Sequence, residues 1–403
     1  MSARSTFGTR ESFGRRAPAR EIARAAPTEA AAAASAIATK STASWPFMTF
    51  GIAAILLAIF ILELHVSIDP MPHLTVSLRN SVALGGVGPY FVFHEKEWWR
   101  IFTAPFLHGS VGHLIGNTVA LCFAGVALER MLGHVWLAAL FSVGAVCGSL
   151  GSLVYGTAVV SVGASGAIMC LVTVLLALSF HYAAGPKANR LRRRALIVVV
   201  SAFLPSAGPG AMQIDYGAHL GGFVAGMALG FFFLIRWHEE DASPGLRGAA
   251  AVVAVAGLCM TILSAILVSA RYPVYAARSA DLIPSALEQS DPAGVARRSE
   301  EFAGRYPHDP LARLLHGTDL FNLRDYSAAE EQARAGLGEG ENLTTEYAPT
   351  LRTQLEMLLA ASLFGEGRRD EARSAAAPFC DMPSTDQYLA KGRELFQQAG
   401  ICN

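Results

Sequence analysis

Residues 164–181 read ASGAIMCLVTVLLALSFH, a run of 18 residues without Asp, Glu, Lys or Arg. At a rise of about 1.5 Å per residue, an apolar helix of roughly this length crosses the hydrocarbon core of a bilayer. The composition of the whole chain agrees, because 52% of its 403 residues are hydrophobic and only 16% are charged. A soluble domain is about 25% charged. The predicted fold class is therefore all-α and polytopic.

Six further apolar runs lie on either side of this one and give seven expected crossings in total. The shortest run follows Arg192–Arg194 and meets Pro205 early. The six runs cover residues 45–65, 112–129, 133–155, 195–205, 216–236 and 248–270.

Basic residues predict the orientation of these spans. Residues 1–44 contain six arginines, and the connection near 182–194 is also rich in Lys and Arg. The connections at 156–163 and 206–215 contain neither. Because Lys and Arg collect on the cytoplasmic side, we expect a cytoplasmic N-terminus and, after seven crossings, a C-terminal domain outside.

Composition divides the chain into four predicted regions. Residues 1–44 are expected to be a disordered basic cytoplasmic tail, although a mitochondrial transit peptide has a similar composition. Residues 45–236 form a six-span core, residues 237–270 a linker and a seventh span, and residues 271–403 a soluble helical domain.

The soluble region contains a weak internal repeat. The helix-start sequence Arg324–Ala329 resembles Gly367–Ala372, about 43 residues further on. Two helix pairs of tetratricopeptide type would explain this spacing, and an unrelated helical bundle remains an alternative. Such pairs offer a surface for a partner protein.

Two classes of function find no support in the composition. Lys plus Arg and Asp plus Glu both number 32, so no net charge attracts the chain to nucleic acid. The six cysteines contain no C-x-x-C pair, which argues against a zinc module or a redox site. Cys380 and Cys402 lie outside the spans and could pair with each other.

Polar side chains inside membrane spans are costly, so each one indicates a partner or a function. Ser165 and His219 both lie at the outer starts of their spans. At this matched depth a hydrogen bond between them is possible, and a neutral imidazole can take a serine proton and return it to a leaving amine. Two alternatives stay open: a serine bonded to its own helix, and a structural or proton-relay histidine.

Small residues flank this predicted pair. Gly163 and Gly166 surround Ser165, while Gly222 and Gly226 make one smooth face after His219. Glycine lets two helix backbones approach closely in a membrane. We therefore expect contact between the two helices.

The second span supplies His113 and Asn117, which share one helix face. Their donors could point at a developing oxyanion, where one fixed donor is worth about 2.7–4 kcal/mol. No His-Glu-x-x-His pattern of a zinc peptidase is present, and we expect neither metal nor cofactor. An aspartyl protease needs two aspartates, and the single candidate Asp215 is interpreted as a helix N-cap.

Together these residues resemble the rhomboid family of intramembrane serine proteases, whose motifs they follow in order over residues of about 45–236. The motifs are Glu97-x-Trp99-Arg100, His108-x-x-x-x-His113-x-x-x-Asn117, Glu129-Arg130, Gly163-Ala164-Ser165-Gly166 and Ala218-His219-x-x-Gly222-x-x-x-Gly226.

The resemblance implies a role for each site residue. Ser165 is the nucleophile, His219 is the general base and acid, and His113 and Asn117 stabilise the oxyanion together with the Ser165 backbone. The motif residues of the first outer loop, Glu97 and Arg100 among them, are structural. The implied activity is hydrolysis of peptide bonds in or next to transmembrane segments of other proteins.

One position departs from the family. Many rhomboids carry an aromatic residue one turn after the serine, where it stacks on the catalytic histidine, and this chain has Met169. A thioether also packs against an imidazole, so we expect an altered orientation of His219 rather than a loss of activity.

The resemblance also implies a location, and two other functions compete with proteolysis. With its extra helix after the core, the chain is expected in the cell (inner) membrane of a bacterium. The main alternative is a non-catalytic rhomboid-like protein that binds membrane helices. A transporter is disfavoured, because the spans show no internal repeat.

Overall fold

The computed structural model describes residues 45–155, 160–180, 185–205, 214–237, 244–347, 349–380 and 387–402. These residues are helical, with only isolated β-bridges between extended segments, so the predicted all-α class is confirmed. The basic tail predicted at 1–44 lies outside the described residues.

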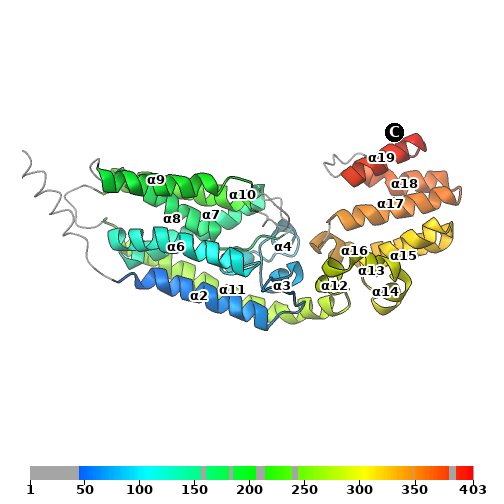
Figure 1. The fold of residues 1–403 in the computed structure, drawn as a ribbon, viewed down its shortest axis with the longest axis horizontal. Coiled ribbons are helices and arrows are strands. Elements are labelled where there is room, and N and C mark those ends of the chain that lie inside the picture. Colours follow the sequence, from blue (N-terminus) through cyan, green and yellow to red (C-terminus); the bar gives the residue numbers. More distant parts are fainter. Residues whose placement is uncertain are drawn as a thin grey trace, which may run out of the picture. The chain divides into compact units, whose positions relative to one another are not determined.

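In the described part of the chain, seven helices form a bundle (Figure 1). Five of them, all except α8 and α9, are long and apolar enough to cross a membrane. The chain is therefore an integral membrane protein. The helices are α2 (Phe47–His65), α6 (Val111–Leu132), α7 (His134–Tyr155), α8 (Ser165–Leu178), α9 (Pro186–Ser201), α10 (Tyr216–Arg236) and α11 (Arg247–Ala280).

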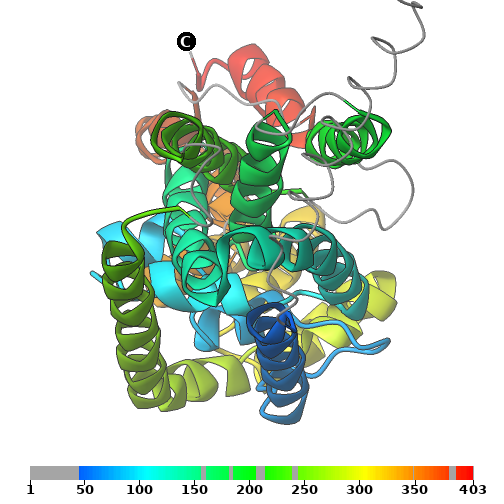
Figure 2. The same cartoon turned by 90° about the vertical axis from the view of Figure 1, so that its left-hand side faces the viewer.

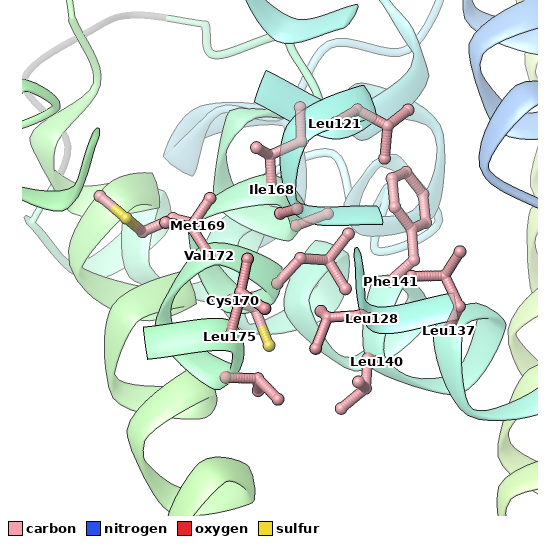
Figure 3. Packing of buried hydrophobic residues seen from close by; sticks show 14 of the residues in the cluster. Leu121, Leu128, Leu137, Leu140, Phe141, Ile168, Met169, Cys170, Val172 and Leu175 are labelled. Carbon is pink, nitrogen blue, oxygen red and sulfur yellow. The ribbon is translucent and has the colours of Figure 1, made fainter. Parts of the chain in front are cut away.

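Helix α8 is the centre of the bundle. Most of its side chains are buried, whereas α2 and α11 lie at the edge of the bundle when it is viewed end-on (Figure 2). Figure 3 shows Ile168 and Leu175 of α8 packing with Leu121 of α6 and with Leu140 and Phe141 of α7. Neighbours on several sides therefore fix the position of α8.

Helix α9 differs from its prediction. The expected span was 195–205, but the helix begins at Pro186 and ends at Ser201. Its first half carries Arg192, which donates to the carbonyl of Ser179 just after α8 at 3.1 Å. The first half of this helix is basic and the second half is apolar. A search for apolar runs therefore finds the second half and misses the first.

Glycines set the distances between α7, α8 and α10. A Cβ atom on Gly222 would lie 2.0 Å from the carbonyl oxygen of Gly166, and one on Gly226 would lie 2.6 Å from that of Cys170. Helix α7 reaches the same place, because a Cβ atom on Gly148 would lie 2.9 Å from the Gly166 Cα and 3.4 Å from the carbonyl oxygen of Ala218. Backbone therefore packs on backbone, as the glycine spacing predicts.

The connection from α2 to α6 folds into four short helices. These helices and the segments between them form the first outer loop of the sequence prediction, and the Glu97-x-Trp99-Arg100 motif ends at the first residue of α5. They are α3 (Leu78–Ala83), α4 (Pro89–Phe93), α5 (Arg100–Thr103) and η1 (Ala104–Phe106).

Eight helices follow α11, which itself continues to Ala280 and so ends well beyond the predicted span at 248–270. The eight are α12 (Ser285–Ser290), α13 (Pro292–Arg297), α14 (Ser299–Arg305), α15 (Pro310–Asn322), α16 (Tyr326–Tyr347), α17 (Pro349–Gly365), α18 (Arg369–Cys380) and α19 (Gln387–Gln398).

The two repeated sequences lie at two equivalent turns. Arg324 and Gly367 both have positive φ, 63° and 83° respectively. After the first turn Asp325 N donates to the carbonyl of Leu320, and after the second Arg368 N donates to that of Leu363. The same closing bonds thus end α15 and α17, and each is followed by a new helix.

A disulfide closes the end of the chain. Cys380, at the end of α18, is bonded to Cys402, and their Cα atoms are 5.5 Å apart. The two cysteines that could pair by their position outside the spans are paired in the structure.

Replacing Gly222 by Ala should destabilise the bundle. The new methyl group meets a backbone carbonyl that cannot rotate away, and overpacking of this kind costs about 1–3 kcal/mol. Thermal unfolding of purified protein in detergent measures the loss. Gly116→Ala is the matched control, because a Cβ atom there has no neighbour within 4 Å. Equal stability of the two variants would contradict the close α8–α10 contact.

Candidate active site

Ser165 is the first residue of α8 and follows a turn that requires glycine. Gly163 has φ of 128°, and a Cβ atom on it would lie 2.6 Å from Cε1 and 2.7 Å from Nε2 of His113. The turn before Ser165 therefore lies directly against the imidazole of His113. Both His113 and Ser165 are partly exposed.

Asn117 lies one turn after His113 on α6 and is buried. A Cβ atom on Gly163 would lie 3.5 Å from its side-chain nitrogen. The same nitrogen lies 3.0 Å from Nε2 of His108. His108 is fully buried, and its backbone N–H donates to the carboxylate of Glu63 at 3.1 Å. His108 thus positions Asn117 against the turn before Ser165.

His219 lies in the first turn of α10. Asp215 is the N-cap of this helix and accepts a hydrogen bond from Ala218 N at 2.9 Å, which confirms its interpretation as a cap. Its other carboxylate oxygen accepts a hydrogen bond from Ser152 of α7. Both oxygens of Asp215 are therefore engaged.

Ser165 and His219 both lie next to the contact between helices α8 and α10. Gly166, next to Ser165, packs against Gly222, and a Cβ atom on Gly166 would lie 3.2 Å from the carbonyl oxygen of Ala218. Among the described residues no hydrogen bond joins Ser165 to His219 directly, and in free enzymes such bonds are often long.

Two contacts of His219 escape sequence reasoning. Its Nδ1 atom lies 2.7 Å from the carbonyl oxygen of Ala202, and its ring meets that of Phe203 edge-on, with centroids 6.2 Å apart. A backbone carbonyl has no sequence signature, and Phe203 looks like one more apolar residue of its run. Met169 is buried among core residues and in Figure 3 points away from Leu137 and Phe141.

Comparison with known proteins identifies residues 95–236, which include all four site residues, as a rhomboid domain. RHOMBOID-like protein 1 of Arabidopsis thaliana is 36% identical over 154 residues, 38% of this chain and 39% of that protein. Residues 95–236 of this chain thus carry a rhomboid domain. Rhomboid protease GluP of Bacillus subtilis is 33% identical over 133 residues, 33% of this chain and 25% of GluP. The chain thus covers less than half of either relative.

The rhomboid domain has a buried arginine at the centre of its first outer loop. Arg100 is 0% exposed; its Nε donates to Glu97 at 2.6 Å, and its Nη1 donates to the carbonyls of Val82 and Gly86 at 2.7 and 2.9 Å. The guanidinium lies over the ring of Phe91, 4.3 Å from its centroid. One side chain therefore joins three segments of the loop.

This loop in turn holds the turn before Ser165. Val87 and Ser161 exchange two backbone hydrogen bonds of 3.0 and 2.7 Å, and Gly163 N donates to the carbonyl of Ala104 at 2.9 Å. The rhomboid motif in the first loop is thus connected by backbone contacts to the candidate nucleophile.

Helix α11, which lies outside the matched domain, adds two partners to this loop. Tyr275 donates a hydrogen bond to Glu97 at 3.0 Å, and Arg271 forms an ion pair with the other oxygen of Glu97 at 3.1 Å. Sequence motifs could not reveal these partners, because they follow Glu97 by more than 170 residues.

Replacing Arg100 by Lys should lower stability by about 3 kcal/mol, because an ammonium cannot reproduce the fork that serves Glu97 and two carbonyls. Arg271→Lys is the matched control, since Arg271 pairs with the same carboxylate but is 47% exposed, and an exposed ion pair is worth about 0–1 kcal/mol. Thermal unfolding in detergent compares them. A larger loss for Arg271→Lys would contradict this order.

Proposed function

We propose that the chain is an intramembrane serine endopeptidase that cleaves membrane proteins in or next to their transmembrane segments, with Ser165 and His219 as a catalytic dyad. The contact of α8 with α10 carries this proposal, since Gly166 and Gly222 bring the helix starts that bear the dyad together. The rhomboid domain, together with a named rhomboid protease among the relatives, supports it.

In the first half of the reaction, Nε2 of His219 takes the proton of the Ser165 hydroxyl as Oγ attacks the scissile carbonyl carbon. The new C–O bond gives a tetrahedral oxyanion. When this intermediate collapses, the C–N bond breaks and His219 returns the proton to the leaving amine. Water then attacks the acyl-enzyme with His219 as base, which releases the carboxylic acid and restores Ser165.

His113, Asn117 and the backbone N–H of Ser165 are the proposed donors to the oxyanion. The first two lie against Gly163, two residues before the nucleophile, which supports this role. Donors fixed before the reaction stabilise the developing charge without reorganisation. His108 contacts the side chain of Asn117, and Glu63 accepts a hydrogen bond from the backbone N–H of His108. Together they hold Asn117 in place.

The length of α8 supports access of water to Ser165. Its 14 residues span about 21 Å, against about 30 Å of hydrocarbon, so at least one of its ends lies below the membrane surface. Polar groups are tolerated at such depth where they line a water-filled cavity. A helical substrate must unwind there, which Gly, Ala or Ser near the scissile bond would favour.

The region after α11 is proposed to be an extracytoplasmic partner-binding domain of tetratricopeptide type. The repeated turns at Arg324 and Gly367 support the repeat. The disulfide of Cys380 and Cys402 supports an oxidising compartment. With the N-terminus in the cytoplasm and seven crossings, the bacterial cell membrane is the proposed location.

Ser165→Ala and His219→Ala should abolish cleavage of a tagged single-span reporter whose outer segment is rich in Ala and Gly. Asn117→Ala should lower kcat about 10²-fold, as loss of one oxyanion donor does. Purified proteins in one liposome preparation are compared on gels. His65→Ala, an exposed histidine at the end of α2, is the control and should cut like the wild type.

Persistence of cutting in Ser165→Ala would exclude this residue as the nucleophile. If wild type neither cuts the reporter nor reacts with a fluorophosphonate at Ser165, while it still binds the reporter, the non-catalytic helix-binding function is favoured instead.

Cys380→Ser should make Cys402 react with a membrane-impermeant maleimide in intact bacterial cells, because loss of the bond frees a thiol outside the membrane. The wild type should react only after reduction. Labelling of Cys380→Ser that requires cell lysis would show that the domain lies inside.

A further inference from the structure

His219 lies at the start of α10, and its Nδ1 atom faces the end of helix α9. Ala202 is the C-cap of α9, and its carbonyl oxygen lies 2.7 Å from Nδ1. A carbonyl oxygen can only accept a hydrogen bond, so Nδ1 carries the proton in this contact. The other ring nitrogen, Nε2, is then the basic one.

A serine protease needs this tautomer. In a Ser-His-Asp triad the aspartate accepts from Nδ1, which fixes the ring and leaves Nε2 free to take the serine proton. In the part of the chain that the structure describes, no carboxylate accepts from Nδ1 of His219, and the nearby Asp215 is engaged by Ala218 N and by Ser152.

We propose that the outer end of α9 positions the catalytic histidine, with the Ala202 carbonyl accepting from Nδ1 in the place of a triad carboxylate and the Phe203 ring fixing the imidazole plane. The proposal rests on the proposed protease function. Ala202 and Phe203 are positioning residues, since both act through His219.

The end of α9 is a defined turn. Ala202 has φ −69° and ψ −15°, and its N–H donates to the carbonyl of Val198 at 3.1 Å. Phe203 N donates to Val200 and Leu204 N to Ser201, at 3.1 and 3.2 Å. These bonds hold the peptide plane after Ala202, so its carbonyl has a set direction.

The Phe203 ring is held as well. It meets His219 at an interplanar angle of 90° and Phe223 of α10 at 89°, with centroids 6.2 Å apart in both pairs. Aromatic rings favour edge-to-face contacts of this kind. The imidazole is thus confined by one hydrogen bond and one ring, both from α9.

Phe203→Pro tests the role of the Ala202 carbonyl. The backbone of the residue before a proline is driven out of the helical range of φ and ψ. In Phe203→Pro the Ala202 carbonyl therefore turns away from His219. Phe203→Ala removes the ring alone and is the matched control for the carbonyl. Leu204→Ala, at an exposed neighbouring position, controls for changes at the helix end.

In liposomes, Phe203→Pro should lower kcat for the single-span reporter at least about tenfold below that of Phe203→Ala, with KM unchanged. Loss of a base's orientation acts on the chemical step and not on ground-state binding. Leu204→Ala should match the wild type.

The tautomer itself gives a readout that does not depend on cleavage. Nitrogen-15 NMR of histidine-labelled full-length protein, with His219→Gln to assign the signal, should show Nδ1 protonated and Nε2 bare in the wild type. Phe203→Pro should show a mixture of both forms, and Phe203→Ala should keep the wild-type form.

Equal kcat for Phe203→Pro and Phe203→Ala, or an Nε2-protonated wild type, would overturn the positioning role even if the protein is a protease. Absence of cutting by the wild type, together with the expected tautomer, would instead remove the proposed function and leave the contact as a structural one.

Discussion

Gly166 and Gly222 bring the backbones of α8 and α10 so close that a methyl group does not fit between them. Ser165 and His219 each start from this contact, so their relative position is set by main chain and not by flexible side chains. The same contact excludes any larger residue at Gly222, and Gly148 of α7 packs against Gly166 and Ala218 at the same junction. A site made this way is rigid because three helices share one backbone junction.

The first outer loop supplies the second constraint. Its buried Arg100 joins Glu97 to the carbonyls of Val82 and Gly86, and the loop then pairs with the turn before Ser165. A buried charge pair of this kind adds little net stability, but removing one partner is costly. Its effect here is to hold the irregular backbone between α2 and α6 in one arrangement.

Much of this could be predicted from the sequence, because membrane helices leave long apolar runs and glycine spacing marks helix contacts. The spans of α2, α6, α7 and α10 and the contact at Gly222 follow from such patterns. A hydropathy search could not find the start of α9, since the first half of this helix is rich in arginine.

The candidate site was predictable to the same degree. His113, Asn117, Ser165 and His219 carry recognisable chemistry. The structure places His113 and Asn117 against the turn before Ser165, and His219 starts next to the contact of Gly166 with Gly222. The acceptor for His219 is a backbone carbonyl of Ala202, which any residue could provide. The partners Arg271 and Tyr275 of Glu97 come from a helix outside the shared domain, where no motif connects them to the loop.

The uneven make-up of α9 has a consequence for the surrounding lipid. Its apolar face begins only at Ala195, after Arg192–Arg194, and side chains such as Ile197 and Val200 are exposed on it. An apolar face this short does not match a bilayer of ordinary thickness, and a mismatch of this kind is met by local thinning of the bilayer or by basic side chains that reach toward the headgroups. The cost of that deformation, a fraction of a kcal/mol per ångström, falls on the helix whose other end touches His219. The thickness of the membrane therefore affects the free energy of the arrangement around His219.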